Sequence, residues 1–185
     1  MEYGLTETKR LKLLPISLEH SNELFKVYSD DLTTQYVPRK RHTKLIETEE
    51  LILSFLSLIQ EKKGLVYTII NKEEQTIIGN AGIYGLDSKN KKAFLGAAIH
   101  SNYWSKGFVT ETLKQLLEIC FKELNLIRVE GSCAEENIAS EIIMKKIGMT
   151  YEGTLRSNVI INGISANSKV YSILDNEFLS NKLAR

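Results

Sequence analysis

The sequence predicts an α/β domain built around one mixed sheet. Stretches rich in β-branched and aromatic residues alternate with stretches whose apolar residues recur every three or four positions, so both strands and helices are expected. Three strand-like stretches between residues 65 and 100 are separated only by polar turns, which predicts an antiparallel meander. A strong helical pattern between the strands at 93–100 and 127–133 predicts a parallel crossover.

Size and charge limit the classes of protein that fit. The 185 residues include two prolines and show no repeat or linker, so residues 1–185 are expected to form one domain. The 24 Lys and Arg nearly balance the 23 Asp and Glu, whereas a dedicated nucleic-acid binder gains affinity from many uncompensated cations. No apolar run reaches the ~18 residues that span a bilayer, and no secretory segment opens the chain. A cytoplasmic protein without nucleic-acid or membrane partners is expected.

Cysteine and histidine usage gives no sign of a metal or redox site. Cys120 and Cys133 lack the spacing of such motifs, and a reducing cytosol keeps them as thiols. Cys120 falls on an apolar helix face and is expected to fill the core. His20, His42 and His100 are scattered. No metal site is therefore predicted.

The N-terminal part predicts a strand, two helices and a basic loop between them. The strand covers residues 10–14, and Ser17 caps the first helix. The second helix ends near Gly64, after the apolar positions Leu51, Ile52, Phe55 and Ile59. The loop at 33–44 contains four cations, Arg39, Lys40, Arg41 and Lys44. These cations either form a solvated surface or steer an anionic ligand or acceptor.

The rest of the chain predicts the sheet and its crossover. Strands are expected at 65–71, 75–86 and 93–100. The clearest helix then presents one apolar face, made of Leu113, Leu116, Leu117, Cys120, Phe121 and Leu124. A strand at 127–133 and a helix at 137–148 follow. The chain closes with a hairpin that turns at Asn162 and Gly163.

The segment between the meander and the strongest helix, residues 100–113, can hold an anion. The first amides of a helix lack partners within it and carry partial positive charge. The amides of residues 105–111 can therefore converge on a phosphate, Gly107 allows a close approach, and Lys106 adds a cation. An ordinary connection remains the alternative. The patterns GxxxxGK[ST] and GxGxxG are absent, which disfavours ATP hydrolysis and nicotinamide chemistry.

Two segments and the hairpin together resemble the GNAT acetyltransferase superfamily. The segments are YWSKGFVTETL and LNLIRVEGSCAEENIASEIIMKKIGMTYEGTLR. The likeness covers roughly residues 8–174 and is closest to the Rim-type branch, the ribosomal-protein N-terminal acetyltransferases. It implies the GNAT fold, a mostly antiparallel sheet whose two parallel middle strands splay apart between flanking helices. It also implies acetyl-CoA as co-substrate and a primary amine as acceptor, either a protein N-terminal α-amine or a small amine.

The resemblance also implies which residues bind acetyl-CoA. The family loop Q/R-x-x-G-x-G/A, which cradles the pyrophosphate, maps onto residues 104–109; Gly107 matches, whereas Trp104 and Val109 depart from the pattern. The implied contacts are Ser105, Lys106, Gly107, Phe108, Val109 and Thr110. The pantetheine arm lies between the two splayed strands, where the amides of Ala98 and Ile99 would polarise the thioester carbonyl. Close packing of a buried strand is the alternative for these small residues.

The same resemblance suggests an acid for the leaving thiolate. Asn137 is expected to cap the last helix. The family's NxxS motif adds a hydrogen bond from Asn137 to the pantetheine and places Ser140 near the sulfur, where it could protonate the thiolate. Other branches use a tyrosine one turn later, and this chain has Met144 there.

The base that deprotonates the amine is less clearly marked. Phe94 occupies a position where many relatives have a carboxylate, which leaves Glu130 as the candidate. Its alternative is an ion pair with Arg128 or Lys169, and His100 is a third possibility. Asn167 stands where close relatives often carry Asp.

No activated nucleophile is evident, so direct attack in a ternary complex is expected, without an acyl-enzyme. The alternative function is a non-catalytic acyl-CoA sensor of the same fold, which the residues at positions 94, 144 and 167 favour. Relatives are often dimers, and by that analogy a homodimer is one assembly that the resemblance allows.

Overall fold

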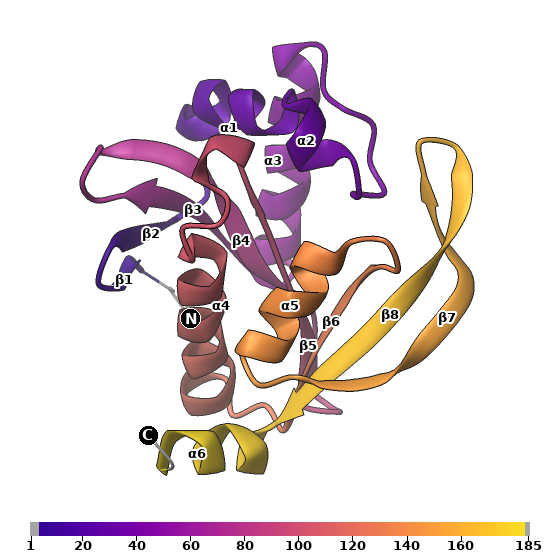
Figure 1. Cartoon of the computed structure of the whole chain (residues 1–185). Coiled ribbons are helices and arrows are strands. Elements are labelled where there is room, and N and C mark those ends of the chain that lie inside the picture. The colour runs from indigo at the N-terminus through magenta and orange to yellow at the C-terminus, as the bar shows by residue number, and fades with distance from the viewer. Residues whose placement is uncertain (1–3, 184–185) are drawn as a thin grey trace.

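The structure is a computed structural model that describes residues 4–183, with side chains as far as Ser180. One sheet runs through the described residues in the order β1-β2-β3-β4-β5-β6-β8-β7 (Figure 1). Its strands are β1 Thr6–Glu7, β2 Leu11–Pro15, β3 Leu65–Asn71, β4 Thr76–Asp87, β5 Lys92–Ile99, β6 Arg128–Ala134, β7 Thr150–Ile161 and β8 Ile164–Leu174. Strands β5 and β6 are parallel, and the other neighbouring pairs are antiparallel. This confirms the predicted mixed sheet.

Helices cover both faces of the sheet. Helices α4 (Phe108–Glu118) and α5 (Ile138–Lys146) lie on one face, and α1 (Ser21–Tyr28) and α3 (Leu45–Gln60) on the other (Figure 1). The short α2 (Asp31–Thr34) follows α1, and α6 (Asp175–Leu183) ends the described chain. No helix within the described range is long and apolar enough to cross a membrane.

The predicted amphipathic helix forms the centre of the larger core. Leu116, Leu117 and Cys120 are fully buried against the sheet. Burial raises the pKa of the Cys120 thiol to about 12, which fits an inert core residue. The helix continues past α4 into a π-helical turn, Ile119–Glu123.

The predicted hairpin is also present. Asn162 and Gly163 both have left-handed φ values, 50° and 80°, as the two-residue turn between β7 and β8 requires.

The structure corrects the predicted start of the first helix. Ser17 caps a 3₁₀ turn, Leu18–His20, and α1 begins only at Ser21. The ring of His20 explains the tighter turn, because its Nδ1 accepts from Ser17 N at 3.3 Å and lies 2.8 Å from Thr68 Oγ1 of β3.

Three further differences concern helix ends. The predicted loop at 33–44 begins inside α2, which Asp30 caps by accepting from Thr33 N at 2.9 Å. Lys62, with φ 57°, turns the chain after α3. Gly64 is needed for close packing instead, because a Cβ there would lie 2.3 Å from Ile83 O. Helix α6 was not predicted.

The parallel strands β5 and β6 separate soon after they meet. Their register pairs are Lys92–Arg128, Ala93–Val129 and Phe94–Glu130, and none follows among the described residues. The strands therefore pair at their starts and leave a gap between their ends. This is the splayed arrangement that the family resemblance implies.

Candidate active site

The turn before α4 is shaped to bind an anion. Gly107 is the N-cap residue of α4 and has left-handed φ and ψ values of 79° and 5°. Ser105, two residues earlier, is also left-handed, with φ 59°. Left-handed residues within a turn direct successive N–H groups to one side and form a concave anion-binding nest.

The amides of this turn are unpaired. Glu111 N makes the first helical hydrogen bond, to Gly107 O at 3.0 Å. The amides of residues 105–110 donate to no acceptor in the described part of the chain. Together with the positive end of the helix dipole, they have the arrangement that suits a phosphate.

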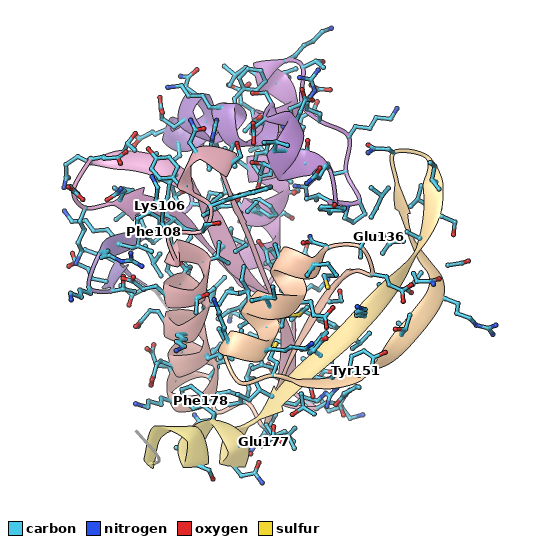
Figure 2. The ribbon with its side chains drawn as sticks, in the orientation of Figure 1. Lys106, Phe108, Glu136, Tyr151, Glu177 and Phe178 are labelled. Carbon is cyan, nitrogen blue, oxygen red and sulfur yellow. The ribbon has the colours of Figure 1, made fainter. Side chains whose placement is uncertain are left out.

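Arg10, the residue before β2, holds this turn in place. Its Nη1 donates to Lys106 O at 2.9 Å, its Nε binds Glu111 Oε2 at 2.7 Å, and its guanidinium lies 4.5 Å from the Phe108 ring centroid. Burial raises the pKa of Glu111, but hydrogen bonds from Thr8 and Arg10 outweigh this effect and hold the pKa below its ordinary value. Figure 2 shows Lys106 and Phe108 at the head of α4. No sequence pattern predicts this contact between Arg10 and the turn before α4.

Hydrogen bonds show which backbone groups of β5 face the gap. His100 N donates to Ile78 O of the neighbouring strand at 2.9 Å, and Ile127 N donates to Lys91 O at 2.8 Å. Because backbone groups alternate sides along a strand, even-numbered residues of β5 turn theirs to β4 and odd-numbered residues turn theirs to β6.

This alternation separates the two amides expected to polarise a thioester. Beyond Phe94, the N–H groups of Ala97 and Ile99 point into the gap. The amide of Ala98 points to β4, where Ala98 is opposite Asn80. Of the two, Ile99 is therefore the one placed to donate to a ligand.

Helix α5 packs against β6, on the same face of the sheet as α4. Asn137 caps it, because Asn137 Oδ1 accepts from Ser140 N at 3.0 Å. The side-chain NH2 of Asn137 and the hydroxyl of the partly buried Ser140 have no hydrogen-bond partner among the described residues. Met144 is buried, and its sulfur lies 3.1 Å from the place that a Cβ on Gly131 would occupy.

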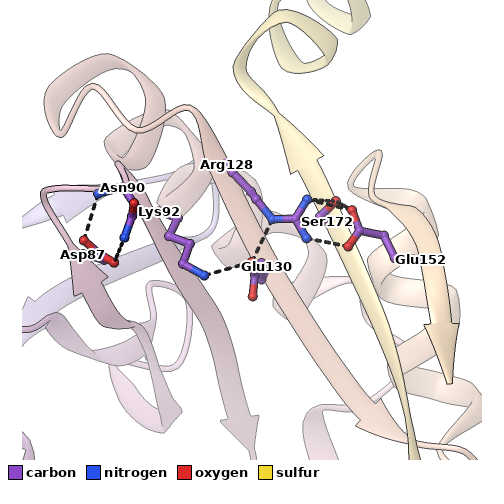
Figure 3. A network of polar contacts seen from close by, with 7 residues as sticks. All are labelled: Asp87, Asn90, Lys92, Arg128, Glu130, Glu152 and Ser172. Atoms are coloured by element: carbon purple, nitrogen blue, oxygen red, sulfur yellow. Dashed lines mark hydrogen bonds and ion pairs between the residues drawn. The ribbon is translucent and has the colours of Figure 1, made fainter. Parts of the chain in front are cut away.

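Glu130 lies at the apex of the gap, in the last register pair of β5 and β6 (Figure 3). Its Oε1 accepts from Arg128 Nε at 2.7 Å and lies 3.8 Å from Lys92 Nζ. Its Oε2 has no partner among the described residues. The expected alternative, an ion pair with Arg128, is thus present, while one oxygen stays available.

Arg128 also binds Glu152 of β7, and this pair gives a stability prediction. Hydrogen bonds from Arg128 and Ser172 lower the pKa of Glu152 from 4.5 to about 2. Such a pair contributes stability that is complete above pH 4.5 and is lost as the pH falls toward 2. In thermal melts across this range, Arg128→Met should flatten the dependence of Tm on pH. Lys26→Met, which removes the exposed ion pair with Glu23, should leave the dependence of Tm on pH unchanged. Equal slopes of Tm against pH in the two variants would contradict the assignment of this stability to the Arg128–Glu152 pair.

The two candidate catalytic side chains approach the gap from opposite faces of the sheet. A Cβ on Gly131 would point to α5, so its neighbour Glu130 points to the face covered by α1 and α3. Ser140 lies on α5 itself. One reactant can therefore enter beside α4 and α5, and a second from the opposite face.

The remaining candidates are tied to local structure. His100 Nδ1 accepts from Asn102 N at 3.2 Å. Asn167 Oδ1 accepts from Ser157 N at 3.0 Å, and its amide donates to Glu135 at 2.8 Å. Lys169 pairs with Glu141 at 2.6 Å and leaves Glu130 to other partners.

The family model for the acetyltransferase (GNAT) domain matches residues 10–150. The chain belongs to the GNAT acetyltransferase family. This GNAT chain is 29% identical over 172 residues to the uncharacterized N-acetyltransferase YoaA of Bacillus subtilis (strain 168), covering 93% of this chain and 97% of YoaA. It is accordingly an acetyl-CoA-dependent acetyltransferase.

Solved GNAT structures share its fold. RimL, a ribosomal L7/L12 alpha-N-protein acetyltransferase in complex with coenzyme A, superposes with a TM-score of 0.84 at 18% identity, over 92% of this chain and 98% of RimL. A spermidine N-acetyltransferase from Vibrio cholerae, in complex with CoA and spermine, gives a TM-score of 0.81 at 20% identity, over 93% of this chain and 99% of that one. The unpaired amides at 105–110 fit the diphosphate of acetyl-CoA.

Proposed function

We propose that this chain transfers an acetyl group from acetyl-CoA to a primary amine, either a protein N-terminal α-amine or a small amine, by direct attack in a ternary complex. The observation that carries the proposal is the turn of unpaired amides at 105–110, set beside the gap between β5 and β6. The named activities of RimL and of the spermidine enzyme support the two acceptor types. The sheet spans both halves of the described chain, which supports one domain over residues 1–185.

The binding roles follow from the unpaired backbone groups. The amides from Ser105 to Thr110 would hold the diphosphate, and Lys106 adds a positive charge. The Asn137 side chain and the edges of β5 and β6 would hold the pantetheine arm. Bound acetyl-CoA supplies the activated thioester, and the Ile99 amide faces the gap to donate to its carbonyl oxygen.

Two side chains of this chain would move protons. Glu130 Oε2 would take one proton from the acceptor ammonium, directly or through water, and the neutral amine would then attack the thioester carbon. As the N–C bond forms and the C–S bond breaks, the Ser140 hydroxyl would give a proton to the departing sulfur and regain, through solvent, the second proton that the nitrogen loses. Since neither residue forms a bond to the acetyl carbon, no acyl-enzyme is required.

The overall proposal is tested by following acetyl-CoA consumption with N-terminal peptides and small amines. Turnover with one of these acceptors is expected. Binding of acetyl-CoA without turnover across the whole set would instead favour the sensor, which Phe94 and Met144 support because neither side chain can exchange a proton.

Glu130→Gln should lower turnover at neutral pH by roughly tenfold and move the pH optimum upward. Without this carboxylate, the acceptor must lose its proton to water before it can attack. The measurement is the pH profile of kcat/KM. Glu152→Gln is the matched control, since it removes the other carboxylate bound to Arg128. Coincident profiles for both variants would remove Glu130 from the mechanism.

A further inference from the structure

Helices α1 and α3 cover one face of β4 and β5, and Glu130 of β6 points to this same face of the sheet. Tyr84 lies on this face, and its ring lies across two glycines. A Cβ on Gly82 would lie 2.8 Å from the Tyr84 hydroxyl oxygen, and a Cβ on Gly96 would lie 3.3 Å from Cε2 of the ring. The Tyr84 hydroxyl has no hydrogen-bond partner among the described residues, although the side chain is half-buried. The Tyr84 hydroxyl is therefore available to a ligand, next to Gly82 of β4 and on the same ring that contacts Gly96 of β5.

Arg39 reaches the same face from the loop between α2 and α3. Its guanidinium lies 5.4 Å from the ring centroid of Tyr28. Tyr28 Oη in turn donates to Asn80 Oδ1 at 2.5 Å, and Asn80 is opposite Ala98 in the register of β4 and β5. Tyr28 and Tyr84 belong to the same cluster of side chains between this face of the sheet and helices α1 and α3.

This guanidinium has no carboxylate partner. Arg39 is half-buried, and no ion pair joins it to an acidic group in the described part of the chain. Its neighbour Arg41 differs, because Arg41 Nε binds Asp31 at 3.0 Å. A partly desolvated guanidinium binds a carboxylate in two parallel hydrogen bonds, and its charge is weakly hydrated.

The carboxylates nearest this face already have partners. Asp30 accepts from the amide of Thr33 at 2.9 Å. Glu47 accepts from the amide of Thr43 at 2.6 Å, and Glu130 is bound to Arg128. None of these carboxylates forms an ion pair with Arg39 among the described residues, so its positive charge is left to bind a ligand.

We infer that the amine acceptor carries an anionic group, in the simplest case a carboxylate, which Arg39 binds with the help of the Tyr84 hydroxyl. This inference rests on the proposed function and narrows its substrate class. The carboxylate belongs either to a free amino acid or to an acidic peptide N-terminus. The inference disfavours a polyamine, because Arg39 would repel its second ammonium group.

The experiment compares acceptors that differ in one charge. Initial rates are measured at saturating acetyl-CoA for free amino acids and their amides, for amidated peptides with Asp or Asn at the second position, and for spermidine. The anionic member of at least one pair should show a kcat/KM about tenfold or more above its neutral counterpart, and spermidine should be inactive. The amino-acid and peptide arms distinguish the two sources of the carboxylate.

Variants then locate the effect. Arg39→Gln should raise KM for the preferred acceptor roughly 10- to 100-fold, with kcat and the KM for acetyl-CoA nearly unchanged. Arg39→Lys should restore part of the loss, and Tyr84→Phe should raise KM about threefold. Lys40→Gln, which removes an exposed cation next to Arg39, is the matched control and should behave as wild type.

Three results overturn the inference: equal use of neutral and anionic acceptors, acetylation of spermidine, or an unchanged acceptor KM in Arg39→Gln. Each of these leaves the acetyltransferase proposal intact, because acetyl-CoA is still consumed. If no amine is acetylated, the proposed function fails, and the substrate assignment fails with it.

Discussion

Replacing Gly107 with valine is expected to weaken acetyl-CoA binding by about 100-fold, as measured by calorimetry. Gly107 has φ 79°, a conformation that a β-branched residue adopts only at considerable cost. The chain would relieve that strain by turning the amides of residues 105–110 away from one another. Each hydrogen bond from such an amide to a charged phosphate contributes about 1.5–3 kcal/mol, so loss of one or two accounts for the effect.

Gly163→Val provides the matched control for this substitution. Gly163 has φ 80°, and no atom lies within 4 Å of the place that its Cβ would take, at the tip of the hairpin. Both variants therefore carry a similar backbone strain, of about 1–2 kcal/mol. Only the first should lose affinity. Equal affinity in the two variants would mean that the turn before α4 does not hold the diphosphate.

Ser140→Ala is expected to reduce kcat by roughly 10- to 100-fold, while the affinity for acetyl-CoA changes less than about twofold. Alanine keeps the backbone amide that donates to Asn137 Oδ1, so the cap of α5 stays intact. The loss should therefore come from the missing hydroxyl proton. Single-turnover kinetics measures the chemical step without product release.

Ser140→Thr tests the same role from the opposite direction. Threonine restores a hydroxyl at the same backbone position and should recover much of the activity. A wild-type kcat in Ser140→Ala would exclude Ser140 as the acid. Because Met144 cannot replace it, the thiolate would then leave without help from α5.

Much of the fold was predictable because its signals are local. The meander, the helix around Leu116 and the turn at Asn162 each depend on residues that are close in sequence. The 3₁₀ turn after Ser17 could not be predicted in this way, because it depends on a contact between His20 and Thr68 of a distant strand. Asp30, which caps α2, is a residue type that often begins a helix, so this helix could have been predicted. The run of basic residues that follows favoured a loop instead.

The candidate site likewise combines features that depend on residues close in sequence with features that depend on distant ones. Gly107, between a strand and a strong helix, was enough to suggest an anion site. The brace from Arg10 to Glu111 was not visible, since 101 residues separate the two. Arg39 and Arg41 look alike within a run of cations, and only the fold shows that Asp31 neutralises one of them. The roles of Asn137 and Ser140 came from family resemblance.

Because β5 and β6 separate early, the sheet consists of two blocks that few backbone hydrogen bonds connect. Strands β1 to β5 form one block, and β6, β8 and β7 form the other. A pantetheine arm between β5 and β6 would supply the missing hydrogen bonds. Binding of acetyl-CoA and the rigidity of the protein are therefore thermodynamically linked. The rate of amide hydrogen exchange at Ala97 and Ile99 would then depend on how much acetyl-CoA is bound. In a cell depleted of acetyl-CoA, the unoccupied enzyme would be more flexible around this gap.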